Sequence, residues 1–161
     1  MDRFVSNFTH RLDAKGRVSI PATFRSVLAK DGFEGLYVRP SLEAETLDCG
    51  GHALLREIDA LLATWPAGSA ERDMLATALL GTSEILKVDP EGRIVLTESL
   101  KASARISDEA TFVGHGHKFQ IWEPGRFRAR LAEAQRRMLE LGRPPVPGLA
   151  AEFSSVPGAV P

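Results

Sequence analysis

The chain has 161 residues, a formal net charge of −1 and 43% hydrophobic residues, which is the composition of a soluble globular protein. No apolar run approaches the roughly 20 residues that span a bilayer, and the amino terminus lacks a signal-peptide pattern. We therefore expect a cytoplasmic protein without membrane contact. The single cysteine, Cys49, excludes an internal disulfide and a zinc framework, and we expect a buried small residue or an incidental thiol.

The first forty residues predict strands around one short helix. Alternating and helical apolar spacings give a strand at 3–8, a hairpin of strands at 10–13 and 17–20, a helix at 22–30 and a strand at 35–39. Pro21 takes a favourable first helical position, and Asp31-Gly32 ends the helix. This first half thus combines strands with a single helix.

Residues 40–82 form the most acidic and most helical segment of the chain. Apolar residues recur at helical spacing from Leu54 to Trp65, including Leu55, Ile58, Leu61 and Leu62. Ser69 can cap a second helix, which ends at Gly81. Its expected apolar face consists of Met74, Leu75, Ala78 and Leu79. We expect these two helices to pack on the halves as a connector.

The second half repeats the plan of the first. Its predicted strands lie at about 84–88, 92–96, 110–114 and 118–122, and a capped short helix lies at 97–101. His115-Gly116-His117 joins the last two strands. Two histidines could suggest a metal, but no carboxylate or thiol framework accompanies them, so we favour a turn.

A long amphipathic helix is predicted from 123 to 141, followed by a proline-rich tail. Its inward face is expected to hold Phe127, Leu131, Ala134, Met138 and Leu141. Its other faces are rich in arginine, which suits either a solvated surface or an assembly surface. Residues 143–161 hold five of the ten prolines and predict a disordered segment.

One motif occurs twice, 76 residues apart. Shifting the segment 12–20 by this distance aligns it with 88–96, and three residues of the first copy find identical partners. These are Asp13 with Asp89, Gly16 with Gly92 and Arg17 with Arg93. The surrounding apolar pattern also matches, which predicts an internal duplication. Asp at the first position and Gly at the fourth are typical of tight turns, so the turn alone accounts for both residues.

The two arginines of the repeat have no comparable role in a turn. Arg17 and Arg93 could be surface partners of the neighbouring aspartates, which would stabilise the fold little. Because the arginine recurs in both copies, and because Lys15 adds a positive charge to the first turn, we favour a binding role.

The charge distribution favours a local anion-binding surface despite the net charge of −1. Residues 1–30 hold six Lys or Arg against two acidic residues, whereas residues 31–86 hold three against ten. A basic patch around the first turn suits phosphate binding. One modest patch would bind weakly, so many copies presented together would bind better.

The two motifs, their separation and the closing segment 112–123 resemble the MraZ family of transcriptional regulators, over roughly residues 1–141. The resemblance implies an α+β fold of two AbrB-like (SpoVT-AbrB) swapped-hairpin β-barrel halves that form an intrachain pseudo-dimer, with packed connecting and C-terminal helices. The implied segments are a first half at 1–50, a helical connector at 51–82, a second half at 83–125, a C-terminal helix at 126–142 and a disordered tail at 143–161.

The resemblance also implies a function. Members bind double-stranded DNA at repeated sites in the promoter of the bacterial division and cell-wall gene cluster, and they form homo-oligomeric rings in the cytoplasm, associated with the nucleoid. The DNA-binding residues carried over are Arg3, Lys15, Gly16, Arg17 and Arg93. Glu91 stands where Lys15 stands in the first copy, so the second turn should bind more weakly. The segment 43–51 does not match the family pattern.

Two other classes of function compete with DNA binding. Asp13 and Asp89 could form a catalytic carboxylate pair, but turn chemistry explains both, and no nucleophilic constellation, phosphate-cradling loop or metal cluster accompanies them. We therefore predict no enzyme, no cofactor and no small-molecule substrate. The alternative is an antitoxin-like or scaffold protein of the same fold that binds a protein partner in a salt-insensitive way.

Overall fold

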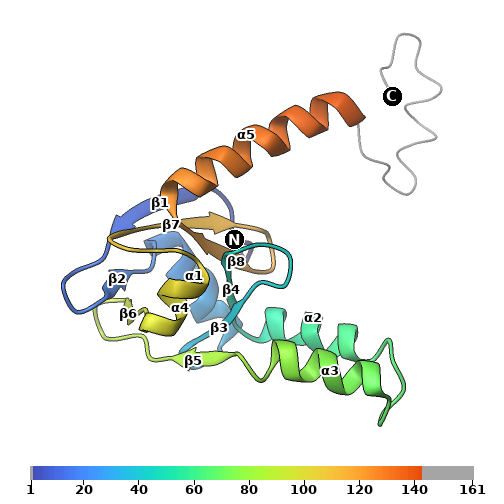
Figure 1. Ribbon diagram of the computed structural model, residues 1–161. Coiled ribbons are helices and arrows are strands. Elements are labelled where there is room, and N and C mark those ends of the chain that lie inside the picture. Colours follow the sequence, from blue (N-terminus) through green and yellow to red (C-terminus); the bar gives the residue numbers. More distant parts are fainter. Residues whose placement is uncertain (1, 143–161) are drawn as a thin grey trace. The chain divides into compact units, whose positions relative to one another are not determined.

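The computed structural model describes residues 2–142, in which strands and helices are mixed along the chain (Figure 1). The strands are β1 Asn7–Arg11, β2 Arg17–Ser19, β3 Leu36–Pro40, β4 Leu47–Gly50, β5 Glu84–Leu86, β6 Arg93–Val95, β7 Glu109–Gly114 and β8 Phe119–Trp122. The helices are α1 Ala22–Asp31, α2 His52–Leu62, α3 Ala70–Leu79, α4 Glu98–Ser103 and α5 Pro124–Leu141. The α+β class is confirmed; the tail predicted at 143–161 lies outside the described residues.

The main sheet has six strands in the order β1-β7-β8-β4-β3-β5, and each neighbouring pair is antiparallel. One sheet face, α1, α4 and the β2–β6 pair together bury the larger hydrophobic core. The ring of Phe24 in α1 lies 5.3, 5.6 and 5.0 Å, between centroids, from the rings of Phe4, Phe8 and Phe119. This core joins both halves of the sequence in the unit that extends to Pro124.

The strands that flank each turn of the repeat do not pair with each other. β1 pairs with β7, and β2 pairs with β6, which is the equivalent strand of the second copy. Val18 stands opposite Ile94, and Arg17 stands opposite Val95. Each residue of β2 has its equivalent in β6, 76 positions later. The two strands of the ladder are therefore equivalent, and their pairing is symmetric. The hairpin predicted within each copy is therefore wrong, because β2 and β6 bury their apolar side chains beside each other and β5 pairs with β3.

The strand predicted at 3–8 begins later than expected. Phe4 makes only an isolated bridge to Gly116, and β1 starts at Asn7. Ser6 between them has a φ of 73°, which interrupts the extended backbone. At the other end of the bridge, Gly116 has a φ of 82°, as suits the predicted turn, and His117 Nε2 lies 2.7 Å from Glu57 Oε2 of α2.

Strand β4 was not predicted, because its sequence contains an aspartate and a glycine, which are rare in strands. Leu47 and Cys49 point into the core, and Asp48 lies buried between them on the other face of the sheet. There its carboxylate contacts Arg39 Nη2 at 3.2 Å and Lys118 Nζ at 3.3 Å. The acidic middle segment therefore contributes a buried charge to the sheet, as well as helices.

Helices α2 and α3 lie side by side over a second, smaller core (Figure 1). This core is built from Tyr37, Leu54, Ile58, Leu62 and Leu79. The Ser69 side chain caps α3 by accepting a hydrogen bond from the N–H of Arg72 at 3.3 Å, as predicted. The predicted apolar faces are only partly buried: Leu61, Trp65 and Met74 are exposed.

Helix α5 begins within a residue of its predicted position and ends at Leu141. Within the unit that holds it, the helix has no fully buried residue, and Leu131, Met138 and Leu141 of its expected inward face are exposed. Arg136 pairs with Glu140 at 2.8 Å along the helix surface. No helix in the described part of the chain is long and apolar enough to cross a membrane.

Candidate nucleic-acid interface

Each copy of the repeat folds into a turn that is stabilised by hydrogen bonds to its own aspartate. Oδ1 of Asp13 accepts hydrogen bonds from the N–H groups of Lys15 and Arg17, both at 2.9 Å. The N–H of Asp13 donates to the carbonyl of Arg17, also at 2.9 Å. Asp89 makes the equivalent hydrogen bonds with Glu91 and Arg93, at the same distances. This shared geometry explains why both copies carry Asp.

Gly16 allows the first turn to approach strand β6 closely. Its φ is +79°, and a Cβ at this position would lie 3.2 Å from the carbonyl oxygen of Leu96. Its N–H donates to Asp13 at 3.0 Å, and its carbonyl accepts from the N–H of Leu96 at 3.0 Å. Because both backbone groups are bonded within the protein, Gly16 serves to position its neighbours.

The aspartate of each turn also orients the arginine that follows. Arg17 Nε lies 2.6 Å from Asp13 Oδ2, and Arg93 Nε lies 2.9 Å from Asp89 Oδ2. The pKa of Asp13 is lowered, first by the hydrogen bond from the N–H of Arg17, and the pKa of Asp89 is lowered in the same way by Arg93. Both carboxylates are therefore charged at neutral pH, and each arginine is held through Nε.

The two arginines differ in what remains available to a ligand. In the described part of the chain, only Nε of the Arg17 guanidinium has a partner, and its two terminal amino groups have none. Arg93 Nη2, in contrast, lies 2.9 Å from Glu91 Oε2, and the pKa of Arg93 is raised, first by its hydrogen bond to Asp89. Arg25 of α1 donates to the Glu91 carbonyl at 3.0 Å. The first turn thus offers a freer cation than the second.

The β2–β6 pairing brings the arginines of both copies to one surface. We call the two strands and their turns, residues 13–19 and 89–95, the ribbon. Because side chains alternate along a strand, Arg17, Ser19, Arg93 and Val95 lie on its outer face, opposite the buried Val18 and Ile94. Arg17 and Arg93 are diagonal neighbours, with Cα atoms about 7–8 Å apart in such a pair. One face therefore presents two guanidinium groups.

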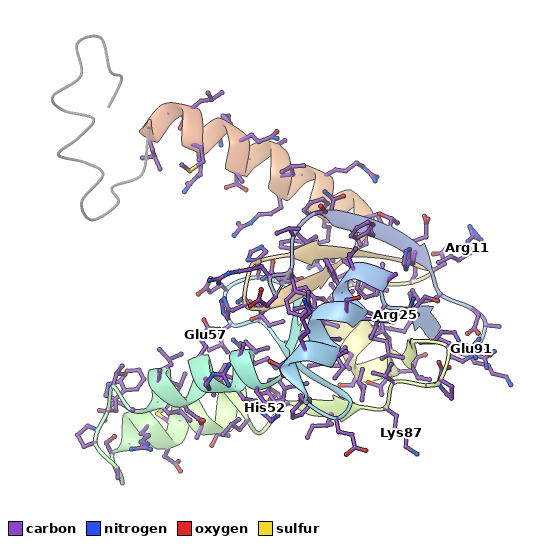
Figure 2. All side chains as sticks on the ribbon, turned by 180° about the vertical axis from the view of Figure 1, so that it is seen from behind. Arg11, Arg25, His52, Glu57, Lys87 and Glu91 are labelled. Carbon is purple, nitrogen blue, oxygen red and sulfur yellow. The ribbon has the colours of Figure 1, made fainter. Side chains whose placement is uncertain are left out.

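Two further basic residues flank the ribbon and were not predicted as site residues. Arg11 and Lys87 are equivalent under the 76-residue shift, and both are exposed on the side of the molecule where Glu91 lies (Figure 2). Lys87, Arg17 and Arg93 line one hollow of about 300 Å³. The signal that could have identified the pair was the match of two basic residues in the aligned copies.

Arg3 does not belong to this group. It lies beside the Phe4–Gly116 bridge, whereas the first turn begins beyond the other end of β1. Of the five predicted DNA-binding residues, the structure brings Lys15, Gly16, Arg17 and Arg93 together on the ribbon, and leaves Arg3 at the distant end of the strand.

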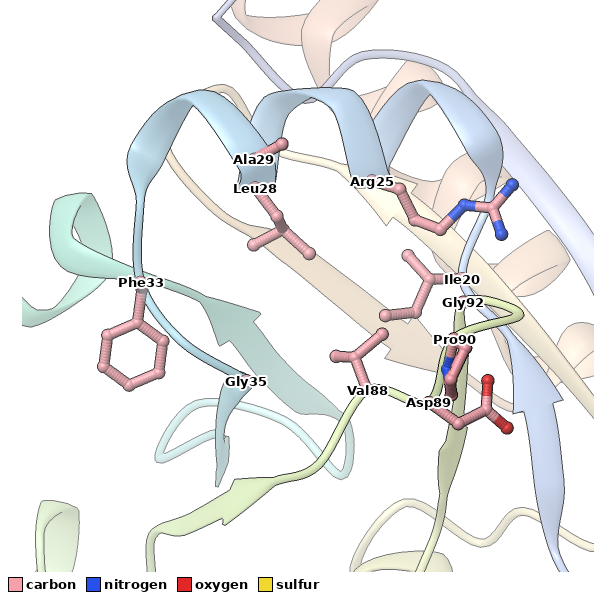
Figure 3. A pocket seen from close by; sticks show the side chains of 10 residues that line it. All are labelled: Ile20, Arg25, Leu28, Ala29, Phe33, Gly35, Val88, Asp89, Pro90 and Gly92. Atoms are coloured by element: carbon pink, nitrogen blue, oxygen red, sulfur yellow. The ribbon is translucent and has the colours of Figure 1, made fainter.

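A second hollow, of about 390 Å³, lies between α1 and the second turn (Figure 3). Ile20, Leu28 and Val88 supply apolar walls, and the Arg25 side chain extends over Gly92, which has no side chain to block it. Residues 2–142 contain no group of three His, Cys, Asp or Glu side chains placed to hold a metal ion. Burial raises the pKa of the Cys49 thiol well above its ordinary value, so this thiol is protonated.

Comparison with known proteins identifies the class of protein to which this chain belongs. A family model described as "MraZ protein, putative antitoxin-like" matches residues 78–140. A protein of Beijerinckia indica named "Transcriptional regulator MraZ" is 71% identical over 141 residues, which cover 88% of this chain and 86% of the relative. Proteins of the same name from Methylocella silvestris and Parvibaculum lavamentivorans are 68% and 44% identical, over 89% and 86% of this chain and 87% and 86% of theirs.

These relatives bear the name of transcriptional regulators, a non-enzymatic class, which agrees with the prediction that the chain is no enzyme. The chain belongs to the MraZ family. The family resemblance deduced from the paired motifs is thereby confirmed.

Proposed function

We propose that this chain is a transcriptional regulator that binds double-stranded DNA through the ribbon, at repeated sites in the promoter of the division and cell-wall gene cluster. The observation that carries the proposal is the state of Arg17, which Asp13 holds through Nε while both terminal amino groups stay available. An arginine held in this way can donate two hydrogen bonds to O6 and N7 of guanine. The regulator name of the relatives supports the same function.

Within this proposal the basic residues divide into two tasks. Lys15, Arg11 and Lys87 are exposed at the ends of the ribbon and would bind phosphates, which gives affinity without sequence preference. Arg17 and, less strongly, Arg93 would contact base edges. A two-stranded ribbon is narrow enough to enter the major groove. Gly16 acts by setting the turn. Arg3 could contact only DNA that extends beyond the ribbon.

We also propose that the chain is a pseudo-dimer of two AbrB-like swapped-hairpin halves, with the segment boundaries stated above. The symmetric β2–β6 ladder supports this, because the equivalent strands of the two copies pair with each other. The proposed assembly is a homo-oligomeric ring in the cytoplasm, at the nucleoid. Exposed apolar residues on α2, α3 and α5, such as Leu61, Met74 and Leu139, would suit contacts between copies. Several ribbons bound at once would raise the affinity.

A salt series tests the proposed function. The purified protein should bind the fragment upstream of its own gene more tightly than a shuffled fragment, and log K should fall linearly with log salt, with a slope of about −0.9 per phosphate contacted. Fluorescence anisotropy between 50 and 300 mM salt measures this. The alternative function, an antitoxin-like or scaffold protein, predicts no preference for the fragment and a partner bound in a salt-insensitive way.

Reversing the charge of Glu91 should strengthen DNA binding. Glu91→Lys gives the second turn the charge of Lys15 and releases Nη2 of Arg93, so the salt dependence should steepen by about one phosphate contact per chain. Glu91→Gln should raise the affinity less and leave the slope unchanged. The matched control is Glu71→Lys, which makes the same charge change at an exposed position on α3. Equal gains from Glu71→Lys and Glu91→Lys would show that only net charge matters.

A further inference from the structure

Val95 is an aliphatic side chain that the described fold leaves uncovered. It is 48% exposed on the outer face of the ribbon, whereas its neighbour Ile94 is 1% exposed and lies in the core. The equivalent position of the first copy holds Ser19, which is polar and also exposed. The ribbon therefore accepts either a polar or an apolar residue here, and burial does not account for the valine.

The surroundings of Val95 place it inside the DNA-binding surface. It stands directly opposite Arg17 in the β2–β6 ladder. Its Cγ1 lies 3.9 Å from the position that a Cβ on Gly16 would take, so the side chain leans over the first turn. With Arg17, Lys87 and Arg93 it lines the hollow of about 300 Å³. Any base pair bound by Arg17 would have Val95 as an adjacent apolar surface.

The major groove of DNA presents one apolar group, the C5-methyl group of thymine, and aliphatic side chains recognise it by contact. We infer that Val95 contacts a thymine methyl beside the base pair bound by Arg17 and so determines part of the sequence specificity. This inference rests on the proposed DNA-binding function. Ser19, opposite Arg93, offers a hydroxyl, which can bond several base edges. The two ends of the ribbon therefore recognise different sequences.

The test compares two forms of one DNA fragment with the full-length protein. The fragment upstream of the gene is synthesised with thymine, or with deoxyuridine at each thymine position, which removes only the methyl groups. Wild-type protein should bind the deoxyuridine form at least about fourfold more weakly, the loss expected for one buried methyl group. Val95→Ser should bind both forms equally, near the wild-type affinity for the deoxyuridine form.

Val5→Ser is the matched control, because Val5 is 50% exposed and lies near the distant end of β1. It should keep the wild-type preference for thymine, and a thermal melt should show that both variants are folded. If wild-type protein binds both forms equally, or Val95→Ser keeps the preference, the inference is wrong while DNA binding stands. If wild-type protein binds neither form, the proposed function itself fails, and the inference fails with it.

Discussion

Arg17→Ala is expected to weaken binding to the upstream fragment by about 5- to 150-fold at each site, the effect of losing a bidentate base contact worth about 1–3 kcal/mol. The loss should be greater for an assembly that uses several ribbons together. The melting temperature and the mass of the oligomer should not change, since an exposed ion pair stabilises a fold little. Anisotropy titrations, together with a thermal melt and light scattering, measure all three quantities.

Two companion variants separate base contact from charge. Arg17→Lys keeps the positive charge but lacks the planar guanidinium that Asp13 holds through Nε, so it should lose much of the preference for the specific fragment while retaining salt-dependent binding. Arg93→Ala should weaken binding less than Arg17→Ala, because Glu91 and Asp89 already hold the Arg93 guanidinium. If Arg17→Ala binds like the wild-type protein, Arg17 is only the surface partner of Asp13.

Phe24→Ala is expected to reduce the free energy of unfolding by about 3–5 kcal/mol, which is typical when a fully buried phenylalanine is truncated. Phe24 is 1% exposed and contacts three other rings from both halves of the chain. Since domains have only about 5–15 kcal/mol to lose, the melting temperature should fall by roughly 6–20 °C. Circular dichroism at one fixed protein concentration measures this.

The control for Phe24→Ala is Phe33→Ala, the same truncation at a half-buried ring beside the hollow between α1 and the second turn. It should lower the melting temperature by much less. Phe24→Leu should lie between the two, because it keeps most of the apolar volume. Equal effects at positions 24 and 33 would mean that Phe24 does not join the two halves in the way its contacts suggest.

The sequence carried enough local information to predict most elements and both turns. Helical spacing, the Ser69 cap and the Asp-to-Gly turns depend on neighbouring residues, and α1, α3, α4 and both turns are found near their expected positions. The class of site followed from a different signal, the recurrence of an arginine that the turn itself does not need.

What the sequence did not predict depends on contacts between distant residues. The β2–β6 pairing joins residues more than 70 positions apart, and the strand around Asp48 lies between the nearby β3 and the distant β8. Arg3 is close to the first turn in sequence, but β1 carries it to the other end of the sheet. The exposed apolar faces of α3 and α5 show helical spacing too, and spacing does not reveal what a face packs against.

The symmetric β2–β6 ladder also has a consequence for folding during translation. The strand that contains Val18 cannot pair until Ile94, 76 residues later, has been synthesised. At about 5–20 residues per second, translation leaves this edge open for roughly 4–15 s. During that interval the nascent chain carries an unsatisfied strand that could pair with the same strand of a chain on a neighbouring ribosome. The order of synthesis thus makes intertwined misassembly a specific hazard for this protein.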